Sequence, residues 1–129
     1  MKYIDLHCDT AGRMLYENDG LKSNSFKIDI EKMKKGGALA QVFAFFIDIG
    51  EVKNPFLEFQ IMYRNLEKEL AKNKKDITLV RNVDELSKAE KDKKIGAFLS
   101  IEEGETLEGN IDNIQKVYDY GVRFITLTW

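Results

Sequence analysis

The order of segments along the chain constrains its fold more than any other feature of the sequence. Nearly continuous apolar runs at residues 39–47 and 95–101 alternate with segments whose apolar residues recur at helical spacing. Strands that are apolar on both faces are typical of a parallel sheet covered on both sides. The alternation therefore predicts an α/β fold in which helical crossovers connect parallel strands.

The expected elements follow from periodicity and from capping residues. Four main strands, adjacent in sequence order, are expected at residues 3–8, 39–47, 95–102 and 123–129, with a short strand-like piece at 77–80. Helices are expected at 29–35 behind an Asp29 cap, from Pro55 to Leu70, from an Asn82–Glu85 capping box to about Asp92, and from an Asn110 cap to Gly121. This pattern contains no linker or internal repeat, so residues 1–129 are expected to belong to one domain.

Composition excludes several classes of protein. Hydrophobic residues make up 43% and charged residues 33%, which is ordinary globular composition. The net charge of −2 gives no reason to expect a nucleic-acid or membrane partner, and no apolar run approaches the ~20 residues of a membrane span. A single cysteine, Cys8, excludes an intrachain disulfide. Met1 is followed by strand-like sequence without a signal-peptide pattern, so we expect a cytoplasmic protein.

The strongest local signal for chemistry is the pair His7 and Asp9. Residues two apart on a strand face the same way, and this pair ends the first expected strand. An imidazole nitrogen and a carboxylate oxygen suit zinc or a similar divalent ion. The alternative is a helix-capping aspartate beside a surface histidine.

A second signal is Glu102, at the C-terminal end of the third main strand. Barrel enzymes place catalysis at this rim, where His7 and Asp9 are also expected, and a glutamate can bridge two metal ions. The alternative is an acidic turn formed by Glu102, Glu103 and Glu105. Gln41 lies within an apolar strand, where a buried amide needs partners. It is expected either to orient His7 from beneath the metal site or to bond neighbouring groups in the barrel interior.

Two further residues are interpreted as structural. Asp48 lies close to the end of the second main strand and is expected to form a turn, and Cys8 is expected to be a small buried apolar group and neither a ligand nor a nucleophile.

Four blocks of sequence resemble the membrane (renal-type) dipeptidase family. The blocks are IDLHCDT at 4–10, GGALAQVF at 36–43, SIEEG at 100–104 and YGVRFITLT at 120–128. They occur in the family's order and spacing and span the whole chain. The first block separates this family from the wider amidohydrolases, which typically have His-x-His there. Trp129 stands where mammalian-type members have a histidine thought to contact the substrate, so the chain looks more like bacterial members.

The resemblance implies a (β/α)₈ barrel of the TIM type that hydrolyses dipeptides with a water activated between two zinc ions. His7 and Asp9 would bind one ion, and Glu102 would bridge both and act in catalysis. The family's remaining ligands, two histidines, belong to later strands, and His7 is the only histidine here. A complete barrel needs about 250 residues, so this chain is expected to be the N-terminal half with about four β/α units.

Two functions from different classes are compatible with these features. In the first, the chain is the N-terminal portion of a zinc dipeptidase and is inactive alone, because it encodes at most one partial metal site. In the second, it is a non-enzymatic half-barrel module that associates with itself or with a complementary chain, because its first and last strands have open edges. A homo-oligomer, or pairing with a C-terminal half, is expected in either case.

Overall fold

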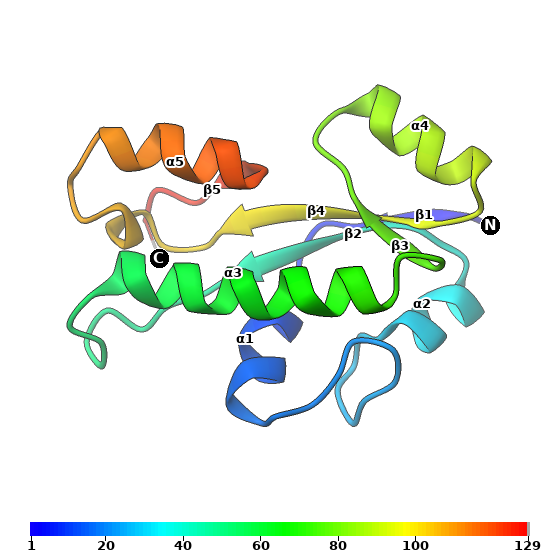
Figure 1. Cartoon of the computed structure of the whole chain (residues 1–129), viewed down its shortest axis with the longest axis horizontal. Helices are drawn as coiled ribbons and strands as arrows, with labels where there is room; N and C mark the ends of the chain where they lie inside the picture. Colours follow the sequence, from blue (N-terminus) through cyan, green and yellow to red (C-terminus); the bar gives the residue numbers. More distant parts are fainter. Residues whose placement is uncertain (129) are drawn as a thin grey trace.

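The computed structural model describes residues 1–128 and contains five parallel strands with helices between them (Figure 1). The elements are β1 Tyr3–Asp5, α1 Thr10–Tyr16, α2 Ile30–Gly36, β2 Ala38–Phe45, α3 Pro55–Lys72, β3 Ile77–Leu79, α4 Val83–Lys91, β4 Ile95–Ile101, the 3₁₀ turn η1 Gly104–Leu107, α5 Asp112–Tyr120 and β5 Val122–Ile125. Among these described residues, no helix is both long and apolar enough to cross a membrane.

The sheet confirms the predicted order of the main strands. β1 pairs with β2, β2 with β4, and β4 with β5, and every pair is parallel. β3 pairs with Ile95–Ala97 at the start of β4, whereas β5 pairs with Leu99–Ile101 at its end. The two short strands therefore share one edge of β4. This is the parallel β/α arrangement expected of part of a barrel.

The capping residues act as predicted at several helix ends. Asp29 accepts a hydrogen bond from the backbone of Lys32 at 2.7 Å, and Asn82 accepts one from the backbone of Glu85 at 2.8 Å. Gly37 ends α2 with φ +81°, a left-handed conformation that favours glycine. Local sequence signals thus fix where α2 and α4 begin.

Several strand boundaries expected from the sequence were wrong, and one helix was missed. The first strand ends at Asp5 rather than at residue 8, the second ends at Phe45 rather than at 47, and α1 was not predicted at all. The alternation of polar and apolar residues through Cys8 favoured a longer strand, but Leu6 is exposed and Cys8 is buried. The chain leaves the sheet there to enter α1. The last strand, expected at 123–129, is observed at Val122–Ile125, and Trp129 lies outside the described residues.

The main core lies between one face of the sheet and helices α1, α2, α3 and α5. Phe45 meets Phe59 of α3 edge to face, with ring centroids 5.1 Å apart. The opposite face is covered at its N-terminal end by α4, because Gly96 has no side chain. A Cβ at Gly96 would lie only 2.7 Å from Cδ1 of Leu86. The C-terminal ends of the strands, toward which the arrows point in Figure 1, carry the candidate site.

Candidate metal site

His7 is positioned by the segment that connects β1 to α1. The backbone N–H of His7 donates to Oδ1 of Asp5 at 3.3 Å. The carbonyl of Cys8 accepts from the backbone of Ala44 at 2.9 Å, which holds the segment against the end of β2. His7 and Asp9 therefore converge from a loop anchored to the sheet, not from one face of a strand as the sequence suggested.

Asp9 occupies the N-cap position of α1, but its carboxylate makes no capping hydrogen bond. Instead, Oδ1 of Asp9 lies 3.2 Å from Nε2 of His7. The contacts of the Asp9 side chain thus exclude the alternative that it caps the helix. Its carboxylate remains available at the C-terminal rim.

Glu102 reaches the same place from β4. Its backbone N–H donates to the carbonyl of Phe45 at 3.2 Å, so the first residue after β4 stays fixed to the end of β2. Its side chain is 20% exposed, and Oε2 lies 3.3 Å from Nε2 of His7. The acidic-turn alternative applies to the next residue instead, because Glu103 caps η1 through the backbone of Glu105.

The three side chains form one compact group. One ligand atom from each of His7, Asp9 and Glu102 lies within 4.8 Å of the others. Two ligands bound at about 2.1 Å to one tetrahedral ion lie about 3.4 Å apart. The two distances from Nε2 of His7, 3.2 and 3.3 Å, are close to this separation. The donor set, one imidazole and two carboxylates, consists of groups that bind divalent metal ions.

The polar atoms themselves indicate that a cation fits. One Nε2 faces two carboxylate oxygens, and a single N–H cannot satisfy both well. Oε2 of Glu102 is buried and has no hydrogen-bond partner among the described residues. Burying a charged oxygen without a partner is costly, and a bound cation would remove that cost. The residues present therefore fit a divalent metal ion.

Gln41 does not contact His7. It is fully buried, and its Nε2 donates to the backbone carbonyl of Val42 at 3.1 Å. Residues two apart on a strand face the same way, so Gln41 shares the helix-facing side of β2 with Phe43 and Phe45, whereas it was expected beneath the metal site or in the barrel interior. The direct orienting contact that we considered for Gln41 is not formed.

Cys8 and Asp48 behave as the sequence suggested. Burial raises the pKa of the Cys8 thiol to about 11, so the reactive thiolate is disfavoured near neutral pH. Asp48 accepts a hydrogen bond from the backbone of Gly50 at 3.0 Å, which stabilises a turn. Neither residue belongs to the candidate group formed by His7, Asp9 and Glu102.

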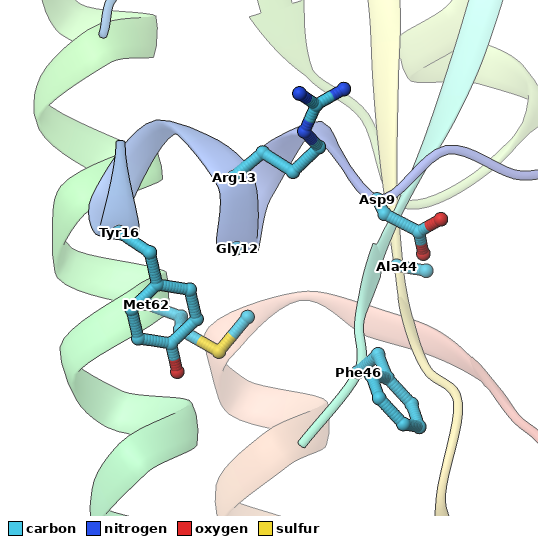
Figure 2. A pocket seen from close by; sticks show the side chains of 7 residues that line it. All are labelled: Asp9, Gly12, Arg13, Tyr16, Ala44, Phe46 and Met62. Atoms are coloured by element: carbon cyan, nitrogen blue, oxygen red, sulfur yellow. The ribbon is translucent and has the colours of Figure 1, made fainter. Parts of the chain in front are cut away.

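A small apolar hollow beside Asp9 was missed by the sequence analysis. We call it the Asp9 pocket; it has a volume of about 140 Å³ and is lined by Asp9, Gly12, Arg13, Tyr16, Ala44, Phe46 and Met62 (Figure 2). It draws these residues from α1, β2 and α3 and from the segments that adjoin them. Because α1 was not predicted, the one sequence signal available, a glycine soon after the His7–Asp9 pair, could not be interpreted.

Comparison with known proteins agrees with this arrangement. The family model of membrane dipeptidase, peptidase family M19, matches residues 1–129. The chain belongs to the membrane dipeptidase family. This family consists of metallodipeptidases. The comparison with curated proteins found no match.

Solved structures show the same fold. The chain is similar to dipeptidase AC, a metallopeptidase of family M19, with a TM-score of 0.85 and 18% identity over 100% of this chain. It is also similar to a metallopeptidase from Rhodobacter sphaeroides liganded with a phosphinate mimic of the dipeptide L-Ala-D-Ala, with a TM-score of 0.85 and 16% identity over 98% of this chain. The chain spans 43% and 45% of those two chains, less than half of each.

Proposed function

We propose that this chain supplies the first half of a dipeptidase active site, in which His7, Asp9 and Glu102 hold a divalent metal ion, zinc by preference. The observation that carries the proposal is the position of Nε2 of His7, within 3.3 Å of a carboxylate oxygen from each partner. Membership of a metallodipeptidase family supports this use of the group.

The metal would supply Lewis acidity and a water of lowered pKa for attack on a peptide bond. The chain's own residues would hold the metal and orient its ligands. The β1–α1 segment presents His7 and Asp9, while the backbone bond between Glu102 and Phe45 fixes Glu102 across from them. Glu102, the least exposed of the three side chains, would hold the metal from the end of β4.

Dipeptides are the proposed substrates of the complete enzyme. The support is the family description and the dipeptide mimic bound to the Rhodobacter sphaeroides relative. We propose that residues 1–129 alone do not hydrolyse dipeptides, since one histidine cannot complete a two-metal site.

The natural protein provides the test of this function. Its intact mass should exceed the 14.9 kDa of this chain. The natural protein should hydrolyse L-Ala-D-Ala in the presence of zinc, and His7→Ala should abolish that activity. The isolated 129-residue chain should show background turnover only. If the isolated chain hydrolysed the dipeptide and His7→Ala abolished that turnover, the proposed inactivity would be wrong.

A second function, a non-enzymatic half-barrel that associates with itself or a complementary chain, is favoured by one observation. Ile4, Leu6, Phe124 and Leu127, on or beside the outermost strands β1 and β5, are all exposed. A natural product of 14.9 kDa that binds no metal would favour this function over the first.

A further inference from the structure

The Asp9 pocket adjoins the candidate metal site through one shared residue. Asp9 contributes both a ligand atom to the His7–Asp9–Glu102 group and part of the pocket wall. Figure 2 shows the thioether of Met62, from α3, below Gly12 of α1, with Phe46 on the other side of the pocket. A group bound at the metal would therefore have this hollow beside it.

The lining of the pocket is mainly apolar. The hydroxyl of Tyr16 donates to Glu58 at 2.6 Å, so it is already paired. Figure 2 shows the guanidinium of Arg13 pointing away from Met62, and it bonds Glu17 at 2.8 Å. Apart from the carboxylate of Asp9, the pocket offers carbon and sulfur surface to an occupant.

The size of the pocket limits what it can hold. A cavity of ~150 Å³ accommodates a benzene-sized group, whereas sites for whole drug-sized ligands begin at about 300 Å³. At about 140 Å³, the Asp9 pocket is too small for a dipeptide but suits one leucine- or phenylalanine-sized side chain. Gly12 keeps this space open, since a Cβ there would lie 3.0 Å from Cε of Met62.

We propose that the Asp9 pocket receives an apolar side chain of the dipeptide substrate and so sets a preference for dipeptides with one such residue. This inference rests on the proposed dipeptidase function and adds a substrate class and a specificity-determining position, Gly12. A larger residue at Gly12 would displace the end of Met62 into the pocket and exclude the side chain.

Methyl NMR of the 129-residue chain tests the proposal without relying on activity. Glycyl-leucine, added to a sample labelled with ¹³C-methyl methionine, should shift the Met62 methyl signal saturably, with and without zinc. The remote Met33 methyl should not move. Burial of a leucine side chain predicts that glycyl-glycine binds about tenfold or more weakly. Gly12→Leu should abolish the preference, and Gly50→Leu, at an exposed turn glycine, should preserve it.

The outcomes separate this inference from the function on which it rests. Equal affinity for the two dipeptides, or an unmoved Met62 signal both with and without zinc, would overturn the pocket assignment. Zinc binding measured on the same samples reports on the metal site alone. A chain that binds zinc through His7 but shows no Met62 response keeps the proposed function and loses this inference.

Discussion

At the scale of single residues, the candidate site contains a group that lowers the stability of the folded chain. Oε2 of Glu102 is buried without a hydrogen-bond partner, although its neighbour Glu103 uses its carboxylate to cap η1. Two adjacent glutamates thus have opposite energetic roles. The proposed metal ion would offset the cost of burying Oε2 of Glu102.

The first prediction compares these two glutamates. In metal-free protein, Glu102→Gln should raise the free energy of unfolding by about 1 kcal/mol or leave it unchanged, because it removes the charge from a buried oxygen that has no hydrogen-bond partner. Glu103→Gln should lower it by about 1 kcal/mol, because the capping bond from the backbone of Glu105 would no longer be made to a charged oxygen. Urea unfolding with 1 mM EDTA measures both. A Glu102→Gln variant less stable than Glu103→Gln would contradict the account.

The second prediction concerns pH and Asp29. Burial raises the pKa of Asp29, but hydrogen bonds from the side chain and backbone of Lys32 and from the backbone of Asn24 outweigh this and hold it below its ordinary value. A lowered folded-state pKa stabilises the protein above the unfolded value of about 3.9, and this contribution is lost as the pH falls through the folded value.

Unfolding of the Asp29→Asn variant checks this sign. Asparagine keeps the capping acceptor but removes the charge. The free energy of unfolding of the variant should therefore fall by about 1–2 kcal/mol at pH 7 and by less at pH 3. Asp48→Asn, at an exposed turn, should change stability little at either pH. An Asp29→Asn penalty that grows as the pH falls would show that the assigned direction is wrong.

At the scale of elements, close packing of α4 on β4 depends on Gly96. Gly96→Ala would place a Cβ 2.7 Å from Cδ1 of Leu86 and 3.1 Å from Cγ2 of Val80. The expected loss is about 1–3 kcal/mol from overpacking. If the contact is the cause, Gly96→Ala should cost less in a Leu86→Ala background, and a double-mutant cycle measures the difference. Additive effects would exclude the contact as the cause.

Elements with strong local signals could be predicted from the sequence, and those fixed by tertiary contacts could not. β4 and α3 follow from apolar patterning and from Pro55, and the Asp29 and Asn82 caps are where expected. α1 has no side-chain capping bond and only seven residues, so no local sequence signal predicts it. The convergence of His7 and Asp9 was predicted correctly, but the argument assumed that both lie on a strand, whereas the strand ends at Asp5. The role of Gln41 depended on which face of β2 it occupies, which an unbroken apolar run does not reveal.

At the scale of the whole molecule, the chain exposes apolar side chains beside its outermost strands, Leu6 at 71% and Phe124 at 48%. The chain also spans less than half of its structural relatives. Soluble monomers rarely tolerate large apolar patches, so we predict that the isolated chain forms a dimer or larger assembly.

Light scattering measures that assembly directly. The double variant Leu6→Ser/Phe124→Ser should shift the chain toward monomer, whereas Val83→Ser, at an exposed position on α4, should not. A monodisperse monomer of the unaltered chain at micromolar concentration would contradict the predicted association.

Zinc binding tests the central claim most directly. Isothermal titration of the chain with zinc chloride should give about one ion per chain, with weak affinity because the partner ligands of a full site are absent. His7→Ala, Asp9→Asn and Glu102→Gln should each weaken binding by at least tenfold, whereas Asp48→Asn and Cys8→Ser should not. Binding that survives His7→Ala, or no binding at millimolar zinc by a folded chain, would contradict the assignment of this group as a metal site.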